Sequence, residues 1–418
     1  MKFRNHDIVM LTSSRWDDEL SSSALSLAKE FSKSNRVFYI DHPFSIKDFF
    51  SGKNKTRIRS RMSSLLLGKG ICRRVEGFPP GFTAVTPKLT IPINWLKDGK
   101  MYNFLSGKND QILYKTLREV IKKNSIKQYI FINIFDPFFF KSFPSDLKPS
   151  RLIYQTVDDI SQEEYIAKHG IRLEKEAISK ADFTFATSRE LVRRVTPFSS
   201  RVFYLPNAAD ISIFKRASNT ILPRPEELKN IIGKIICYTG VIGTRINYDL
   251  LKKIAIHHPD KTLVLVGPAL TSEYIDAGLS DCPNIIFTGA KDINELPAYL
   301  QYSDVAIIPF EYNQLTKSIY PLKINEYLAA GKPVVSTAFS EDIKEFDKVA
   351  YIAKTNEEFL QLIDFAIKEN SLQKKTERMN EAAKNTWQNR VETFWNIVEE
   401  QSEASTGRPG AVSINKTF

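Results

Sequence analysis

Short, largely apolar runs alternate with segments of helical periodicity along the first half of the chain. In residues 22–32, for example, Ala24, Leu27, Ala28 and Phe31 recur at a spacing of three to four, which predicts a helix. The apolar runs do not alternate with polar residues, so we expect strands that are covered on both faces. The predicted strands are residues 7–11, 37–40, 129–134, 152–155 and 183–186. Such strands, separated by helices, predict a doubly wound parallel sheet.

A second alternating series follows a polar segment, residues 215–233, which contains two prolines and is interpreted as an inter-domain linker. The predicted elements of this series are residues 235–239, 250–256, 262–266, 285–288, 296–302 and 305–309. The full chain of 418 residues is also longer than a single core comfortably supports. We therefore expect an α/β protein with two Rossmann-like domains, each built on a doubly wound parallel sheet.

These patterns also predict the domain limits. The N-terminal domain is expected at residues 1–214, with a strongly basic insertion at 47–74, and the C-terminal domain at 234–385. Residues 386–401 predict a helix that could cross back to the N-terminal domain. The last segment, 402–418, is rich in Ser, Gly, Pro and Asn and is expected to be disordered.

The segment 321–337 carries the most informative chemical pattern. Pro321 suits the first position of a helix, and Gly331 suits its left-handed end. Lys323 and Glu326 lie three apart on one face of the first turns, where free N–H groups and the helix dipole favour an anion. A nucleoside diphosphate needs such a cation for its phosphates and a carboxylate for its ribose hydroxyls. The alternative interpretation is an ordinary helix with a solvated Lys and Glu.

This segment resembles the donor-nucleotide motif of glycosyltransferase family 4 and related GT-B enzymes, in which a Glu opens a Glu-aliphatic-small-small-Gly-x-Pro-Val-Val run. Four further segments resemble the same family in the same order, and the resemblance covers roughly residues 5 to 345. They are Trp16-Asp17-Asp18, residues 154–159, residues 205–210 with Phe214, and residues 238–240 leading to 263–267. The resemblance implies a GT-B architecture, with two domains facing a cleft and a nucleotide sugar as donor.

The chain departs from the family pattern on the donor side. Family members commonly carry another Glu eight residues before the position of Glu326, where it contacts the transferred sugar, but Ser318 stands there. Lys323 is similar to the Lys of a Lys-x-x-Glu pattern in some bacterial surface-polysaccharide transferases. We therefore expect Lys323 to contact the diphosphate and to stabilise charge on the leaving group. The stereochemical outcome stays open because of Ser318.

The loop after residues 235–239 is a second candidate for phosphate binding. Gly240 and Gly243 would let backbone N–H groups approach a phosphate, and Arg245 could supply the charge. In the family a basic residue usually follows the first glycine, and Val241 stands there instead. An equally good interpretation is that the two glycines form a simple turn.

On the acceptor side, Asp158 and Asp159 follow a predicted strand, so they should lie at the ligand-binding edge of the first sheet. Paired carboxylates raise each other's pKa, which suits a general base in an inverting reaction. The alternative role is a helix N-cap. Trp16, Asp17 and Asp18 also follow a strand and are expected to contact the acceptor or to stiffen their loop; His42 is a further, weaker catalytic candidate.

The formal net charge of +11 implies an anionic partner, and much of the excess falls in the basic insertion. A helix over residues 57–66 would place an apolar stripe between arginines, the profile of an in-plane helix on anionic lipid. The alternative is a helix packed on the first domain with its arginines snorkelling to the surface. The residues expected to contact the membrane are Arg57, Ile58, Arg59, Arg61, Met62, Leu65 and Leu66.

The leading hypothesis is a metal-independent glycosyltransferase without a cofactor, which moves a sugar from a nucleotide sugar, foremost a UDP-sugar, to a glycan or lipid-linked acceptor. No Asp-x-Asp motif points to the metal-dependent GT-A class, and three scattered cysteines show no metal-ligand spacing. We expect a cytoplasmic protein at the inner membrane face, because no apolar run reaches the roughly 18 residues of a membrane span. The alternatives are a GT-B-type nucleotide-sugar epimerase or hydrolase and a basic nucleic-acid-binding protein. No nucleic acid is expected, because no recognisable binding module appears.

Overall fold

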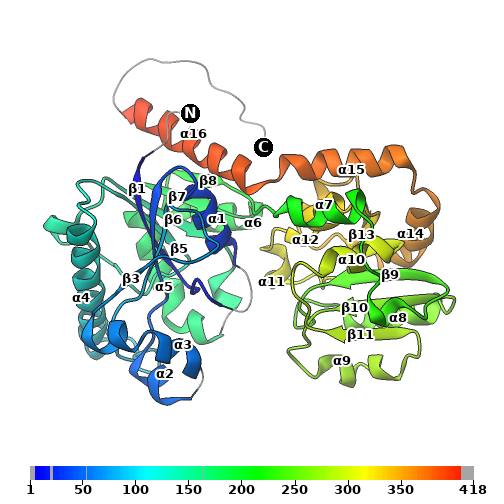
Figure 1. Ribbon diagram of the computed structural model, residues 1–418, viewed down its shortest axis with the longest axis horizontal. Coiled ribbons are helices and arrows are strands. Elements are labelled where there is room, and N and C mark those ends of the chain that lie inside the picture. The colour runs from blue at the N-terminus through cyan, green and yellow to red at the C-terminus, as the bar shows by residue number, and fades with distance from the viewer. Residues whose placement is uncertain (1–4, 19–21, 53, 163, 406–418) are drawn as a thin grey trace. The chain divides into compact units, whose positions relative to one another are not determined.

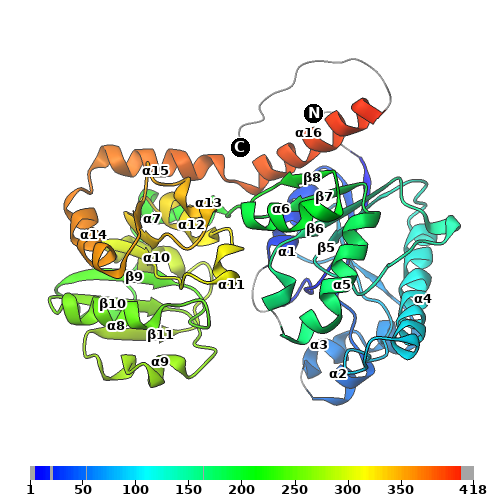
Figure 2. The same cartoon turned by 180° about the vertical axis from the view of Figure 1, so that it is seen from behind.

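The computed structural model describes residues 5–18, 22–52, 54–162 and 164–405, and its chain divides into two compact units (Figure 1, Figure 2). Unit 1 comprises Met1–Ala186, Val192–Leu205 and Gln388–Phe418. Unit 2 comprises Thr187–Leu191 and Pro206–Trp387. Each unit is built around one sheet, so the expected fold class of two doubly wound parallel-sheet domains is confirmed.

The sheet of unit 1 has the strand order β3-β4-β2-β1-β5-β6-β7-β8. Its described strand pairs are parallel except for β3 with β4. The order runs outward in both directions from β1 and β5, so the carboxyl ends of these two strands form the switch point where ligands bind in such sheets. The strands are β1 (Asp7–Thr12), β2 (Arg36–Ile40), β3 (Cys72–Arg73), β4 (Phe82–Val85), β5 (Ile130–Ile134), β6 (Arg151–Thr156), β7 (Phe183–Ala186) and β8 (Val202–Tyr204).

The helices before residue 206 connect these strands. The predicted helix at 22–32 is α1, whose start is fixed by the Ser22 hydroxyl accepting from Leu25 N–H. Its buried face includes Leu27 and Phe31. The helices are α1 (Ser23–Phe31), α2 (Ile46–Phe50), α3 (Lys55–Ser60), α4 (Lys100–Lys123), α5 (Glu164–Lys180) and α6 (Arg189–Val195), with a π-helical turn η1 (Ser63–Leu67) and short 3-10 turns at Ser145–Leu147, Ile160–Gln162 and Thr196–Phe198.

The last described helix, α16 (Trp387–Ser405), belongs almost entirely to unit 1. Phe394 packs on Phe31 and Phe185, with ring centroids 5.0 Å and 4.8 Å apart. This helix occupies the segment expected to be helical at 386–401 and continues to Ser405, although disorder was expected from residue 402. Residues 402–405 contain no Gly or Pro that would end it. The rest of the expected tail, 406–418, lies outside the described residues.

Unit 2 has a parallel sheet with the order β11-β10-β9-β12-β13-β14, and its switch point lies between β9 and β12. The strands are β9 (Lys234–Thr239), β10 (Lys261–Val266), β11 (Ile285–Gly289), β12 (Val305–Ile308), β13 (Val334–Thr337) and β14 (Tyr351–Ala353). The helices are α7 (Ile211–Asn219), α8 (Tyr248–His257), α9 (Glu273–Asp276), α10 (Leu296–Tyr302), α11 (Gln314–Lys317), α12 (Leu322–Ala329), α13 (Glu341–Lys344), α14 (Asn356–Lys368) and α15 (Leu372–Lys384), with 3-10 turns at Glu226–Leu228 and Leu279–Asp281.

The segment expected as an inter-domain linker, 215–233, packs onto the core of unit 2. Ala217 of α7 and Leu228 are buried in the core of unit 2, and Leu222 donates its N–H to the Gln301 side chain at 2.8 Å. The prolines of this segment predict a break in regular structure, but its apolar residues anchor it. The division between the units along the chain therefore falls near residue 206.

None of the helices in the described residues is long and apolar enough to cross a membrane.

Candidate functional site

The loops after β9 and β10 meet the start of α12 at the carboxyl edge of the sheet in unit 2. Gly240 donates its N–H to the carbonyl of Val266 at 2.8 Å, so the two loops lie side by side. Gly240 has φ +143°, and a Cβ there would collide with the Lys323 side chain, whose Nζ would lie 2.6 Å away. Gly267 has φ +151°, and its Cβ would collide with the Gly240 carbonyl. Glycine is therefore required at both positions.

Lys323 and Glu326 lie on the first turns of α12, as the sequence predicts. Their side chains are 23% and 17% exposed, and Lys323 Nζ is 3.9 Å from Glu326 Oε2. Among the described residues, that buried carboxylate oxygen has no hydrogen-bond partner. The two groups are thus close enough to attract each other electrostatically, but the carboxylate can still accept a hydrogen bond. The helix begins one residue later than expected, with Pro321 at the N-cap, while Gly331 takes the expected left-handed conformation at φ +71°.

Two buried tyrosines fix the end of β9 beside this pair. Tyr327 accepts the N–H of Thr239 at 2.9 Å, and Tyr238 donates its hydroxyl to the carbonyl of Val241 at 3.0 Å. Burial raises the pKa of Tyr238, while the positive charge of Arg245 lowers it and Glu326 raises it. Arg245 therefore acts electrostatically on the same small region as Glu326.

The two other donor-side candidates have intrachain roles in the structure. A Cβ at Gly243 would meet only Val241, at an ordinary 3.7 Å, and the Gly243 carbonyl accepts from Tyr248 at 3.1 Å. Ser318 is fully buried after α11, and its hydroxyl donates to the carbonyl of Gln314 at 3.1 Å. Both observations agree with turn or cap roles.

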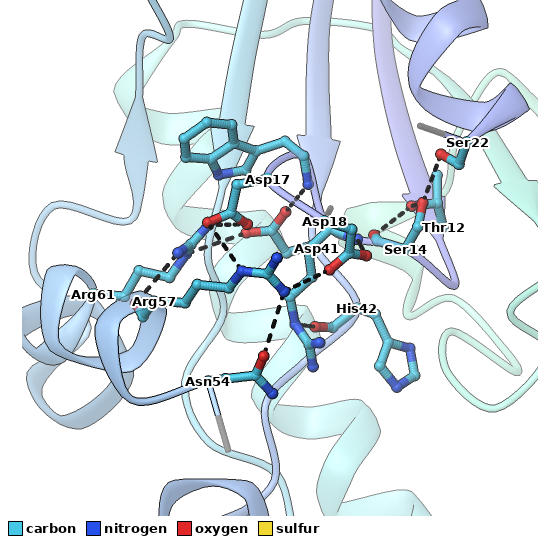
Figure 3. A network of polar contacts seen from close by, with 12 residues as sticks. Thr12, Ser14, Asp17, Asp18, Ser22, Asp41, His42, Asn54, Arg57 and Arg61 are labelled. Carbon is cyan, nitrogen blue, oxygen red and sulfur yellow. Dashed lines mark hydrogen bonds and ion pairs between the residues drawn. The ribbon is translucent and has the colours of Figure 1, made fainter. Parts of the chain in front are cut away.

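In unit 1, the loop that follows β1 carries Trp16, Asp17 and Asp18, and it is held by the basic insertion (Figure 3). Asp17 accepts from Arg61 Nη2 at 2.8 Å, and Asp18 accepts from Arg57 Nη1 at 3.0 Å. Charge-assisted bonds of this kind restrict the loop. The structure therefore supports loop rigidity, the second of the two roles expected for these acids.

Asp41, which follows β2, lies beneath this loop and is 1% exposed. It accepts the Trp16 N–H at 3.1 Å and the Thr86 hydroxyl at 3.2 Å, and Arg61 Nε lies 3.6 Å away. Burial raises the pKa of Asp41 to about 7, while Arg61 opposes the rise. We call Asp17, Asp18, Asp41, Arg57 and Arg61 the acid–arginine network. Sequence analysis missed Asp41, although its place just after a buried strand was visible.

The expected single membrane helix at 57–66 is wrong in its geometry. Helix α3 ends at Ser60 and the π-helical turn η1 follows, so Ile58 and Leu65 are buried against Phe44. Arg57 and Arg61 turn toward the acids instead of flanking an outward stripe. Met62 and Leu66 remain 39% and 48% exposed, and Arg59 is exposed. An amphipathic pattern does not reveal whether its apolar side packs on the protein or on a membrane. Here two of the four apolar residues of the stripe are buried in unit 1.

Asp158 and Asp159 follow β6, where the sequence places them. The Asp159 carboxylate is 1% exposed, accepts from Ser161 N–H at 2.9 Å and pairs with Arg194. It thus caps the turn Ile160–Gln162, which matches the N-cap alternative; Asp158 is half-buried. Nearby, Glu174 accepts from Thr156 at 2.9 Å, and burial raises its pKa to about 7. Sequence analysis missed this carboxyl because it lies within a helix.

A further pair that sequence analysis missed joins His42 to Asp136. His42 Nδ1 lies 2.8 Å from Asp136 Oδ2. Asp136 follows β5 by two residues, and the position after a buried strand is the signal that could have identified it.

Residues 233–368 match the family model for glycosyl transferases group 1. The matched residues lie within unit 2. The site described above falls within this match, which includes Gly240, Arg245, Lys323 and Glu326. The resemblance to glycosyltransferases inferred from the sequence is therefore confirmed, and the match covers residues 233–368.

Among curated proteins, the chain is similar to TuaH of Bacillus subtilis strain 168, whose name assigns it to teichuronic acid biosynthesis as a glycosyltransferase. The two are 30% identical over 165 residues, which is 38% of this chain and 41% of TuaH. The chain thus spans about two fifths of the length of this relative.

Solved glycosyltransferase structures match nearly the whole chain. Sucrose-phosphate synthase from Thermosynechococcus elongatus is 13% identical, with a TM-score of 0.64 over 96% of this chain and 100% of that one. The E. coli trehalose-6-phosphate structure bound with UDP-2-fluoro glucose is 12% identical, with a TM-score of 0.64 over 95% and 99%. Anabaena HepE in complex with UDP and glucose is 14% identical, with a TM-score of 0.56 over 96% and 99%. These likenesses show the expected GT-B fold.

Proposed function

We propose that this protein transfers a sugar from a nucleotide-sugar donor to a glycan or lipid-linked acceptor. The observation that carries the proposal is the meeting of Gly240, Lys323 and Glu326 at the switch point of the sheet in unit 2. Ligands of open parallel sheets bind there. The two similar structures with UDP or a UDP-sugar favour a UDP-sugar as donor, and the name of TuaH favours a surface polysaccharide as product.

In this proposal the donor's diphosphate lies on the N-terminal end of α12. Lys323 and the free backbone N–H groups of the first turn meet the phosphates, and Arg245 adds positive charge from the loop after β9. Glu326 accepts hydrogen bonds from the ribose hydroxyls with the oxygen that lacks a partner among the described residues. Fixed positive groups would stabilise the departing nucleotide, so the proposed reaction uses neither a metal ion nor a cofactor.

A thermal-shift panel with UDP, GDP, dTDP, CMP and AMP tests the donor site. A ligand at about 100 times its Kd should add roughly 2.7 kcal/mol to the free energy of unfolding. We expect UDP to raise the Tm of the wild type, and Glu326→Ala and Lys323→Ala to abolish that shift.

The matched controls are Glu357→Ala and Lys344→Ala, which remove exposed charges of the same types from unit 2 and should leave the shift unchanged. If no nucleotide at millimolar concentration shifts the wild type, the transferase proposal fails. Strongly salt-dependent binding of an oligonucleotide would then favour the nucleic-acid alternative.

We also propose that unit 1 associates peripherally with an anionic membrane at its cytoplasmic face. Several large apolar side chains of the insertion and its neighbour α2 are exposed, among them Phe50 at 78% and Leu67 at 64%. Exposed Lys55, Arg59 and Lys69 accompany them. Apolar side chains that insert and cations that meet lipid phosphates act together in such binding. This surface consists of Phe50, Met62, Leu66 and Leu67 with the three cations, and it replaces the single helical stripe expected from the sequence.

A further inference from the structure

Unit 2 has a second pocket, of about 410 Å³, at the end of α12 opposite Lys323 and Glu326. Its lining comes from α7, α10, the residues after α12 and α15, and these helices pack together within the unit (Figure 1). Lys323 is the second residue of α12 and Gly331 follows its C-cap, so about 12 Å of helix separates the two places. The volume is in the range of small-molecule sites.

The lining of this pocket carries positive charge and no negative charge. Its charged residues are Lys332 and Lys375, and none of the described residues that line it is acidic. Behind the lining, Arg378 is 2% exposed, and its Nη1 donates to the Gly331 carbonyl at 3.3 Å and to Asn370 Oδ1 at 2.8 Å. Two lysines and a buried arginine thus adjoin the same space.

Helix ends explain the positions of two of these cations. Lys332 Nζ donates to the carbonyls of Gln301 and Ser303 at 2.9 Å and 2.7 Å, where α10 ends. Arg378 binds a carbonyl at the end of α12 in the same way. Neither arrangement accounts for Lys375, whose ammonium forms no hydrogen bond or ion pair within the described part of the chain. Its charge is available to a ligand.

The electrostatics of Lys332 show that the charges in this region are not balanced. Burial lowers the pKa of Lys332 to about 8, and nearby Asp304 opposes the fall. The positive charges of Lys375 and Arg378 lower the pKa further. An anion placed among these groups would offset their mutual repulsion and raise the pKa of Lys332.

Gly331 leaves room for Lys375 at the end of α12. The glycine has φ +71°, and a Cβ there would lie 2.7 Å from Lys375 Cγ and 3.1 Å from Ser218 Oγ. The Asn370 oxygen accepts from Arg378, so the Asn370 amide nitrogen is a donor for other partners on the same lining. The pocket therefore combines an unpaired cation with a neutral donor.

We propose that this pocket binds the phosphate group of a small molecule, with Lys375 as the main ligand and the Asn370 amide as a further donor. A phosphate dianion offers several acceptor oxygens and matches a cluster of cations better than a single carboxylate does. None of the described lining residues is aromatic, so the pocket lacks the stacking surfaces of sites for single-stranded nucleic acid. Inorganic phosphate and phosphate esters share this chemistry.

Competitive reductive methylation of lysines, followed by mass spectrometry, tests the site in the wild-type protein. Inorganic phosphate and glucose 6-phosphate are the two probes. A probe at about ten times its Kd should slow the labelling of Lys375 about tenfold, and the labelling of exposed Lys354 should not change. Equal protection by both probes would identify the phosphate group alone as the ligand, and protection by glucose 6-phosphate alone would identify an ester. If neither probe protects Lys375, the proposal is wrong.

Calorimetric titration of variants tests the role of the side chain. The titrations use the Lys323→Ala background, so that phosphate bound at the proposed donor site does not contribute. Adding Lys375→Ala should weaken binding of the protecting probe at least about tenfold, and Lys375→Glu should abolish it, because a carboxylate then faces the anion. Lys384→Ala is the matched control, since it removes an exposed lysine from the same helix. Equal affinity in Lys375→Ala and its background would contradict the proposal.

This proposal and the proposed function can fail separately. If UDP shifts the Tm of the wild type but neither phosphate probe protects Lys375, the phosphate pocket is wrong and the proposed function stands. If a phosphate probe protects Lys375 but no nucleotide shifts the Tm, the proposed function is wrong and the phosphate pocket stands.

Discussion

Both units place acids and cations at the carboxyl edge of a parallel sheet, but they use them differently. In unit 1, the acid–arginine network pairs its carboxylates with guanidinium groups at close range, as in the 2.8 Å bond from Arg61 to Asp17. In unit 2, Lys323 and Glu326 stand 3.9 Å apart, and a carboxylate oxygen has no hydrogen-bond partner among the described residues. In unit 1 the charged groups are paired with one another, whereas in unit 2 the pair leaves hydrogen-bonding capacity unused.

The difference shows why residue type alone does not locate a ligand site. Charges that satisfy one another within the chain stabilise a loop, whereas charges with unused bonding capacity beside an N-terminal helix end are available to a ligand. The same contrast separates Asp159, which accepts from Ser161 and pairs with Arg194, from His42, whose side chain is 36% exposed.

The largest expected effect on stability comes from removing an arginine from the acid–arginine network. At pH 8, where Asp41 is largely ionised, Arg61→Met should lower the free energy of unfolding by about 3 kcal/mol or more, because it leaves this buried carboxylate without its ion-pair partner. Urea unfolding monitored by circular dichroism measures the change. Arg59→Met, which removes an exposed arginine two residues away, should stay within about 0.5 kcal/mol of wild type. Equal effects of the two variants would contradict the buried role of Arg61.

A second prediction concerns the pair of Lys323 and Glu326. Gly240→Ala places a Cβ against Lys323 at a positive φ, so the lysine must move away from its position near Glu326. We expect nucleotide affinity to fall at least about tenfold, or roughly 1.4 kcal/mol, in calorimetric titrations with UDP. Gly243→Ala is the control, since its Cβ would meet nothing closer than 3.7 Å. Unchanged UDP affinity in Gly240→Ala would argue against Lys323 as a phosphate ligand.

The acid–arginine network also predicts a pH dependence. Because burial raises the pKa of Asp41 to about 7, the folded protein holds a proton there that the unfolded chain releases near pH 4. Stability should therefore fall as pH rises between these values, with a slope of up to about 1.4 kcal/mol per pH unit from this group. Asp41→Asn should flatten the curve measured by urea unfolding from pH 4.5 to 7.5.

Glu174 provides an independent comparison for that experiment. Burial raises its pKa to about 7 as well, so it contributes to the same slope of the wild type. Glu174→Gln should remove its own share, and the double variant should remove both. The absolute stability of each variant also changes, because both side chains accept hydrogen bonds, so the slope is the quantity to compare.

The smallest predicted effect concerns the exposed apolar surface of unit 1. The double variant Leu66→Ser with Leu67→Ser should reduce sedimentation with phosphatidylglycerol vesicles by several fold, because two side chains that are 48% and 64% exposed no longer insert. Ile221→Ser is the control, since Ile221 is 96% exposed but lies in unit 2. Binding that is lost equally in both variants, or in neither, would contradict a membrane surface on the insertion.

The sequence predicts most of the fold because parallel strands that are covered on both faces consist of continuous apolar runs. It also predicts the helix of Lys323 and Glu326, since its proline start and glycine end are local signals. These features depend on residues a few positions apart.

The features that sequence analysis missed depend on strand order. Asp136 meets His42 only because β1 lies between β2 and β5 in the sheet, and no local pattern specifies that neighbourhood. In the same way, the repeat that predicts a lipid-facing stripe at Ile58 and Leu65 is equally compatible with packing on Phe44. In the structure Ile58 and Leu65 pack on Phe44, and Arg61 forms ion pairs with Asp17 and Asp41 beside them.

The contact between Gly240 and Lys323 also has an evolutionary consequence. Since a Cβ at position 240 would meet the end of the Lys323 side chain, a substitution at 240 displaces the lysine and the two positions are coupled. A lineage that gains Ala at 240 would keep its fold but lose the placement of the Lys323 charge. Substitutions at 240 are therefore expected to accompany a new source of positive charge in this region.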